Sequence, residues 1–319
     1  MLFTNDSQQP MSNETENHLS CDQMLEKTFI ILNSITGAIV VFGNAVVFLS
    51  IVFTSRLRQQ KVNLFLASLA IADMIMGAFV APGYATFCLG CRQYAVSNYC
   101  WLLEFPKDAV LAGSITNLFA ISFDRYLAVF RPLQYENVMT RRRCVNILIA
   151  VWSVSVSTAV VRSTLYLTIT GPEITAVNGV YNSILMAVVL VTPSILVSII
   201  NIKIIIAIRV QGRQVAVMRN PQDVSEAENL EEIRAEASRK RKGTIACALV
   251  VIIFVVSWIP RISFNIQYLV SGDTHEIDAL LQKLSMFFLL MQSSVNPFIY
   301  SFYRADFRQA VARLLRLGT

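Results

Sequence analysis

The chain has 319 residues, of which 55% are hydrophobic and only 15% are charged. A soluble domain of this size carries about a quarter charged residues, so this composition excludes an ordinary soluble protein. The net charge of +6 does not indicate a nucleic-acid partner, because the basic residues lie in short segments between long apolar runs. That placement is typical of membrane topology.

The first 27 residues are polar and acidic and contain no secretory signal. Two glycosylation sequons, at Asn5 and Asn13, fall in this tail. We therefore expect residues 1–27 to form an extracellular glycosylated tail, with the first apolar helix acting as the insertion signal.

Seven apolar stretches follow, each long enough to cross a bilayer, for which about 20 residues are needed. They cover residues 28–54, 62–86, 100–130, 144–169, 180–208, 244–270 and 279–303. The sequence thus predicts an all-α integral membrane protein with a seven-helix bundle over residues 28–303.

Lysine and arginine are concentrated in the connections after the first, third and fifth stretches and in the C-terminal segment. This bias predicts a multi-pass plasma-membrane protein with its N-terminus outside and its C-terminus inside. The third inner loop is expected at about residues 211–243, with its second half extending the sixth helix. Residues 304–319 are expected to form an amphipathic helix on the inner lipid surface, the alternative being a frayed tail.

Polar residues inside the stretches indicate a buried site. Asp73 lies 11 residues past Val62, about 16 Å deep at 1.5 Å per residue. Further polar side chains occur at comparable depth: Asn44, Ser114, Ser293 and Asn296. A carboxylate among hydroxyls and amides predicts a monovalent-cation or proton site; the alternative is a neutral aspartic acid in a hydrogen-bond network.

Two prolines predict bends in the sixth and seventh helices, because proline removes a backbone hydrogen bond. Pro260 follows Trp258, and Pro297 follows Asn296. At the end of the third stretch stands Asp124-Arg125-Tyr126. Alone, this acid–arginine pair would be read as interface charges that snorkel; with the other features we interpret it as a cytoplasmic switch.

The chain resembles the rhodopsin-like (class A) G-protein-coupled receptors, although no subfamily can be assigned. The resemblance covers almost all of residues 43–307 and rests on one motif per helix: Gly43-Asn44, Asp73, Asp124-Arg125-Tyr126, Trp152, Pro193, Trp258 with Pro260, and Asn296-Pro297 with Tyr300, followed by Phe307.

The resemblance implies a receptor, not an enzyme, that activates a heterotrimeric G-protein. It implies a sodium-and-water pocket at Asp73, Ser114 and Asn296, so a sodium ion is the one cofactor to expect. Arg125 would be freed on activation, with Tyr126 and Tyr300 beside it. The toggle and hinges would be Phe254, Trp258, Pro260 and Pro297.

The family usually links the top of the third helix to the second outer loop by a disulfide, but residues 163–185 contain no cysteine. Cys100 would then pair with Cys21, Cys88 or Cys91.

The ligand candidates are Lys107, Asp108, Arg261, Asn265 and Lys283. Lys107 stands where amine receptors carry an aspartate, so we hypothesise an anionic small molecule, lipid or peptide; the alternative is that Lys107 pairs with an internal acid. The rival function is a transporter or channel that uses Asp73 as an ion site, which would usually show more charged residues along a path.

Overall fold

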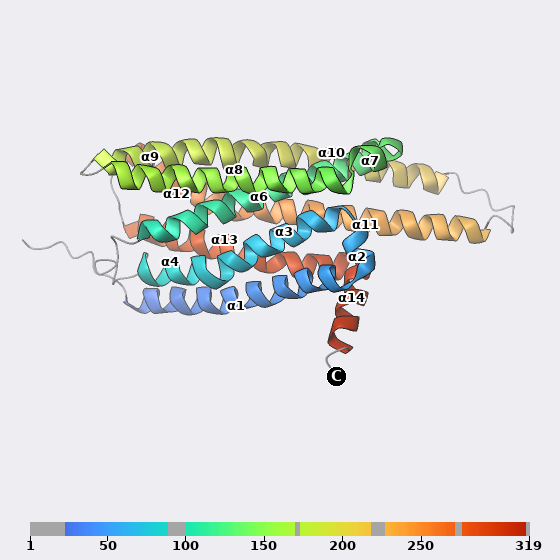
Figure 1. Cartoon of the computed structure of the whole chain (residues 1–319), viewed down its shortest axis with the longest axis horizontal. Helices are drawn as coiled ribbons and strands as arrows, with labels where there is room; N and C mark the ends of the chain where they lie inside the picture. The colour runs from blue at the N-terminus through green and yellow to red at the C-terminus, as the bar shows by residue number, and fades with distance from the viewer. Residues whose placement is uncertain (1–22, 89–99, 170–172, 218–226, 272–275, 317–319) are drawn as a thin grey trace, which may run out of the picture.

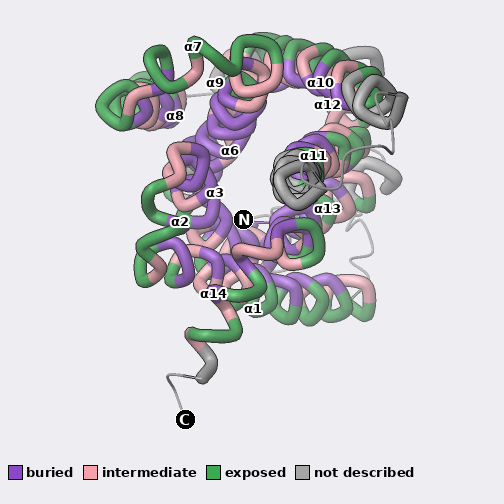
Figure 2. Tube along the Cα trace, turned by 90° about the vertical axis from the view of Figure 1, so that its right-hand side faces the viewer, coloured by how far each residue is buried: buried purple, intermediate pink, exposed green. Residues whose placement is uncertain are grey.

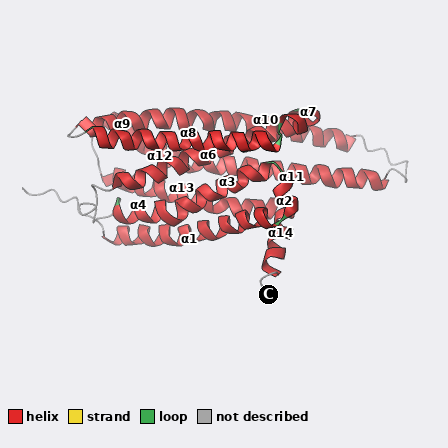
Figure 3. Ribbon diagram, viewed as in Figure 1, coloured by secondary structure: helices red, strands yellow, loops and turns green. Residues whose placement is uncertain are grey.

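The computed structural model describes residues 23–88, 100–169, 173–217, 227–271 and 276–316, and in these ranges every long element is helical (Figures 1 and 3). The helices that cross the bundle are α1 (Gln23–Phe53), α3 (Val62–Ile75), α4 (Ala81–Phe87), α6 (Cys100–Phe130), α8 (Arg141–Thr168), α9 (Glu173–Leu185), α10 (Thr192–Val217), α11 (Ala227–Ser257), α12 (Ile259–Ser271) and α13 (Glu276–Tyr303). Short helices at one end are α2 (Ser55–Gln59), α7 (Pro132–Val138) and α14 (Ala305–Arg316).

These elements form seven rods in the described ranges, because α3 and α4 are continuous through η1 (Met76–Val80), α9 and α10 are continuous through η3 (Met186–Val191), and α11 leads into α12. Five rods are both long and apolar enough to cross a membrane by composition alone. The other two, α6 and α13, are as long but carry polar residues on their inner faces.

Apolar and polar side chains are distributed in the opposite way to that in a soluble protein. Large apolar residues such as Phe42, Ile149 and Val188 are 72%, 61% and 62% exposed on the outer surface. Polar residues such as Asp73 and Asn117 are instead buried. Viewed along the bundle, buried positions face the middle and exposed positions face outward (Figure 2). Only a hydrocarbon environment makes that arrangement favourable, which agrees with the predicted fold class.

Two single turns of π-helix interrupt the second and fifth rods, and the sequence analysis did not predict them. Each directly precedes a helix with proline at its second residue, Pro82 in α4 and Pro193 in α10. Proline has no N–H to donate, so one backbone hydrogen bond is lost, and the preceding turn adopts the wider π-helical hydrogen-bond pattern. The wider turn rotates the residues beyond it to a new face.

The sixth rod breaks at Trp258, between α11 and α12. The backbone N–H of Trp258 donates to Val255 O at 3.2 Å, a shortened turn, and the ladder resumes when Ile262 N donates to Trp258 O at 2.9 Å. Pro260, near the start of α12, accounts for the break. The seventh rod runs through Pro297 without interruption. There Gly43 of α1 packs so close that an added Cβ would lie 2.9 Å from Pro297 Cγ.

The segment expected as the third inner loop is mostly helical. α10 continues to Val217 and α11 begins at Ala227, so residues 211–217 and 227–243 extend the fifth and sixth rods. At the same end, α14 runs across the long direction of the bundle (Figure 1). It buries Phe307 and Ala310 and exposes Arg308 and Arg313, as an amphipathic helix does.

Candidate functional site

A cavity opens at the end of the bundle that carries the start of α6. It holds about 760 Å³ of space outside the atoms, including its mouth. Its floor is apolar and contains Leu111, Ile115, Trp258 and Leu289. Its charged and polar wall residues are Tyr84, Lys107, Asp108, Arg162, Asn182, Arg261, Asn265, Gln282 and Ser285. An apolar chamber with a few convergent polar groups is the usual form of a small-molecule site.

Two acids on α6 organise the charges of this cavity. Glu104 and Asp108 are four residues apart and therefore lie on one face of the helix. Lys107 Nζ lies 2.5 Å from Glu104 Oε2, so Lys107 is paired internally. This is the alternative in which Lys107 pairs with an internal acid. Lys107 and Asp108, both ligand candidates, line the cavity.

Arg162 of α8 joins the two acids, a role that the sequence did not predict. Its Nε donates to the Asp108 carboxylate, and its Nη1 lies 3.3 Å from Glu104 Oε2. Its Nη2 donates to Asn182 Oδ1 at 2.5 Å. All three charged groups are at least 90% buried. The available signal was an arginine near the end of one apolar helix and two acids one turn apart on another.

Arg261 lines the same cavity but takes no part in this ion-pair network. Of the charged residues that line the cavity, it is the one with no carboxylate within ion-pair distance in the described part of the chain. Its guanidinium lies 5.4 Å from the centre of the Phe264 ring. Asn265, on the same helix, donates to Met186 Sδ at 3.1 Å. Lys283, the remaining ligand candidate, is half-buried but does not line the cavity.

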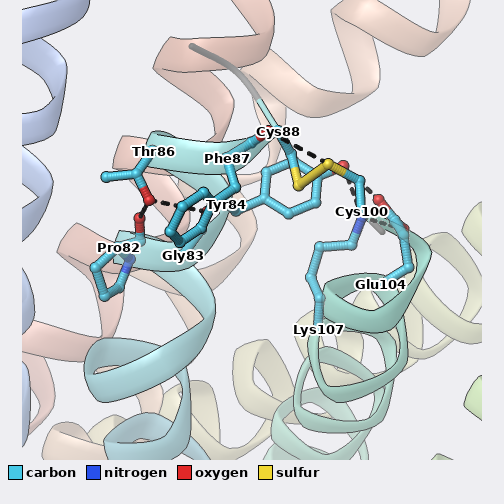
Figure 4. Close-up of a disulfide and its surroundings, with 9 residues drawn as sticks. All are labelled: Pro82, Gly83, Tyr84, Thr86, Phe87, Cys88, Cys100, Glu104 and Lys107. Atoms are coloured by element: carbon cyan, nitrogen blue, oxygen red, sulfur yellow. Dashed lines mark hydrogen bonds and ion pairs between the residues drawn. A yellow bond between two sulfur atoms is a disulfide. The ribbon is translucent and has the colours of Figure 1, made fainter. Parts of the chain in front are cut away.

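A disulfide joins Cys88, which directly follows α4, to Cys100 at the start of α6, which confirms that Cys100 is disulfide-bonded (Figure 4). A second link lies one helical turn away: Tyr84 is four residues before Cys88, and Glu104 is four residues after Cys100. In that link, the Tyr84 hydroxyl donates to Glu104, and Lys107 Nζ lies 4.7 Å from the Tyr84 ring centre. Two successive links therefore hold α4 against α6. Cys21 and Cys91, like Asn5 and Asn13, lie outside the described residues.

Asp73 is 2% exposed at mid-bundle and accepts two hydrogen bonds from α13. Ser293 Oγ donates at 2.7 Å and Asn296 Nδ2 at 2.8 Å. Asn44 Nδ2 donates to the Ser293 carbonyl at 3.1 Å. Ser114 is buried on α6 but forms no hydrogen bond to Asp73. The site therefore links the first, second and seventh rods by oxygen-rich side chains.

Trp258 lies between the cavity and the bundle core. Its ring centre is 5.8 Å from that of Phe254 in α11, and its buried indole N–H has no hydrogen-bond partner among the residues that the structure describes. Tyr300, further along α13, packs on Phe307 of α14 with ring centres 5.9 Å apart.

The opposite end of the bundle holds the Asp124–Arg125 pair. Arg125 donates to Asp124 Oδ2 through Nη2 at 2.6 Å and Nε at 3.0 Å. Tyr135 of α7, which the sequence analysis missed, donates its hydroxyl to Asp124 Oδ1 at 2.9 Å. Burial, followed by the charge of Asp124, raises the pKa of Tyr135 well above its ordinary value, so it remains a donor. Tyr126 instead stacks on Phe130, with ring centres 4.7 Å apart.

A second polar cluster, also missed from the sequence, joins α14 to the α2–α3 connection. Arg304 is 8% exposed and donates to Asn63 Oδ1 at 2.8 Å, Gln60 Oε1 at 2.7 Å and Asp306 Oδ2 at 2.7 Å. Its guanidinium also lies 4.5 Å from the Phe307 ring centre. Gln60 Nε2 donates to Asp306 at 3.2 Å, which closes the cluster.

Comparison with known proteins agrees with this architecture. Residues 43–300 match the family model of the 7 transmembrane receptor (rhodopsin family). Similar proteins include the histamine H2 receptor of Homo sapiens, 27% identical over 297 residues that cover 90% of this chain and 79% of the relative. The histamine H2 receptor of Rattus norvegicus is 26% identical and covers 93% and 82%. The probable G-protein coupled receptor No18 of Amphibalanus amphitrite is 26% identical and covers 98% and 94%. The chain therefore belongs to the rhodopsin family of seven-transmembrane receptors.

Proposed function

We propose that this G-protein-coupled receptor binds a small anionic ligand in the cavity above Trp258 and thereby activates a heterotrimeric G-protein. The observation that carries the ligand class is the charge of Arg261, which has no carboxylate within ion-pair distance among the described residues, beside a chamber whose other charged lining residues are paired. Lys107 and Arg162 each have an acid within 4.0 Å, so a ligand gains most from the one cation that lacks one. The apolar floor would receive the body of the ligand.

An amine is the alternative that the histamine receptor relatives raise. An ammonium group needs an acid that is not already neutralised. Asp108 is the acid that lines the cavity, and it is bound by Arg162. A cationic ligand would have to break that buried pair and would also meet the like charge of Arg261. The charge arrangement therefore favours an anion.

We propose that the cavity is extracellular and that the Asp124–Arg125 end faces the G-protein in the cytoplasm of a plasma-membrane receptor. The support is the excess of lysine and arginine at the Arg125 end, which includes Arg141, Arg142 and Arg143. An epitope added before residue 1 should be labelled by antibody on intact cells, and one added after Thr319 only after permeabilisation. The reverse labelling would contradict the orientation.

We propose further that a sodium ion binds at Asp73. The Asp73 carboxylate, the hydroxyls of Ser293 and Ser114, and the amide oxygen of Asn44 are the hard donors such a cation prefers. Replacing choline chloride by sodium chloride should lower agonist affinity in the parent and have no effect in Asp73→Asn. Equal sodium sensitivity in both proteins would remove the ion from the proposal without affecting receptor function.

The receptor proposal is tested by nucleotide exchange on purified G-proteins with the receptor in nanodiscs. A panel of small carboxylates and phosphates is compared with neutral amides of the same shape and with histamine. We expect exchange with at least one anion, none with its neutral counterpart, and none from Arg125→Ala with any ligand. Activation by histamine that persists in Arg261→Gln would contradict the anionic ligand. Ion flux without exchange would instead support the transporter or channel alternative.

A further inference from the structure

A second crevice opens on the outer surface, between α10 and the broken sixth rod. It holds about 620 Å³ outside the atoms, including its open side. Its outer edge is formed by Ile195 and Ile199, which are 55% and 45% exposed. Its floor is formed by Leu190 and Trp258, which are 6% and 7% exposed. The remaining lining residues are Val191, Ser194, Ser198, Val255 and Ile262.

The shape of the crevice follows from small residues and from the helix break. Ser194 and Ser198 are four residues apart, so they lie on one face and leave a shallow strip along α10. The opposite wall leaves room because the rod breaks at Trp258 and α12 then packs chiefly against α13. The lining spans residues 190–199, about 13 Å along the helix. The crevice therefore runs along the helices.

Hydrocarbon is the medium that reaches this crevice. Both walls belong to segments long and apolar enough to cross a membrane, residues 179–210 and 244–266. None of the lining residues is charged, and Ser198 Oγ already donates to Ser194 O at 2.7 Å. A charged occupant would find no counter-charge among these residues, whereas an apolar one would bury its surface. The length and direction suit an extended chain better than a flat ring system.

We propose that the acyl chain of a membrane phospholipid occupies this crevice and contacts Trp258 from the lipid side. Trp258 and Leu190 also line the ligand cavity, so they form a wall between the two sites. The occupant of the crevice therefore supports the face of Trp258 opposite to the ligand. This site is separate from the anionic ligand site and does not depend on G-protein coupling.

The test is quenching of Trp258 fluorescence by phospholipids brominated in the middle of the acyl chain. The chain has three tryptophans, so Trp101→Phe and Trp152→Phe leave Trp258 as the reporter. In nanodiscs of brominated lipid we expect the Trp258 signal to be quenched. Ser198→Phe, which fills the crevice, should abolish this quenching. Ile202→Phe adds the same ring one turn further along the exposed face, outside the crevice, and should retain it.

Equal quenching in Ser198→Phe and Ile202→Phe, or no quenching in the parent, would overturn the proposal. Quenching by a brominated sterol but not by brominated phospholipid would replace the acyl chain with a sterol and also overturn it. If Trp101→Phe and Trp152→Phe prevent folding, Ser198→Phe and Ile202→Phe are compared in the protein that keeps all three tryptophans. The loss of quenching on Ser198→Phe then reports the Trp258 contribution.

Discussion

Asp108 of α6 and Arg162 of α8 form a buried ion pair between neighbouring helices in the wall of the cavity that Trp258 also lines. Arg162 is 4% exposed and also contacts Glu104, so one guanidinium is the shared counter-charge of two carboxylates. Buried charges are stable only when their partners are present, since neither can recover its hydration. The packing of α6 against α8 beside the cavity therefore depends on Arg162.

Replacing Arg162 with methionine should markedly destabilise the receptor. It would leave Asp108 and Glu104 without their shared partner, and breaking a buried pair costs roughly 3–5 kcal/mol. The measurement is thermal unfolding of purified protein in one detergent. Arg142→Met is the matched control, because Arg142 is exposed on the same helix. Equal melting temperatures for the two variants would show that the pair contributes little.

Lys107 and Arg261 should respond differently to substitution, although both are cations at the cavity. Lys107→Met should lower the melting temperature because it leaves Glu104 without its 2.5 Å partner. Arg261→Gln should leave the melting temperature unchanged and lower the potency of an anionic agonist about 10- to 100-fold, the loss of one charge-assisted contact. The prediction fails if Arg261→Gln changes stability but not potency.

The disulfide should be detectable as a peptide pair that contains Cys88 and Cys100 after digestion without reduction. Replacing both cysteines by serine should destabilise the protein by about 2–4 kcal/mol, because the bond restricts the unfolded chain. The two cysteines are 12 residues apart. Signalling should weaken as well, because Tyr84 and Glu104 are held one turn below. A linked peptide joining Cys100 to Cys21 or Cys91 would contradict the arrangement.

The Arg304 cluster predicts a pH-dependent attachment of α14. Burial alone would raise the pKa of Asp306, but the hydrogen bond and charge of Arg304 outweigh it and hold the pKa below the ordinary 3.8. A carboxyl whose pKa is lowered by folding stabilises the folded state above its unfolded pKa. That contribution is lost as the pH falls through the lowered value.

Amide hydrogen exchange in α14, corrected for the intrinsic pH dependence, should therefore rise when the pH is lowered from neutral to below 3.8. Asp306→Asn should show the raised exchange already at neutral pH and little further change. Gln309→Ala, an exposed substitution on the same helix, should behave like the parent. Identical exchange in all three proteins at neutral pH would refute the role of Asp306.

The fold class and the order of the rods could be predicted from the sequence because hydropathy and loop charges report them directly. The third helix, for example, was expected at residues 100–130 and is α6, Cys100–Phe130. The two π-turns could not be predicted, although both precede a proline. A proline indicates that a backbone hydrogen bond is lost, but only the packing of neighbouring helices decides how the chain accommodates the loss.

The candidate sites divide in the same way. Asp73 with Ser293 and Asn296 was expected from depth alone, since residues at equal depth in a bundle can meet. The partners of Arg162 could not be assigned, because the rotation of α8 about its own axis decides which side chains face α6. Charge counting therefore included Lys107 among the cations open to a ligand, whereas geometry shows that Glu104 already neutralises it.

The length of α11 would amplify any tilt at the helix break. The helix is 31 residues long and extends beyond the neighbouring rods at the Arg125 end (Figure 1). As a straight α-helix it measures about 46 Å, so tilting it by roughly 10° at Trp258 would carry its far tip about 8 Å sideways. If the helix tilted at Trp258, α11 would therefore serve as a lever arm, and a small change in the contacts of that ring would produce a much larger displacement at the far tip.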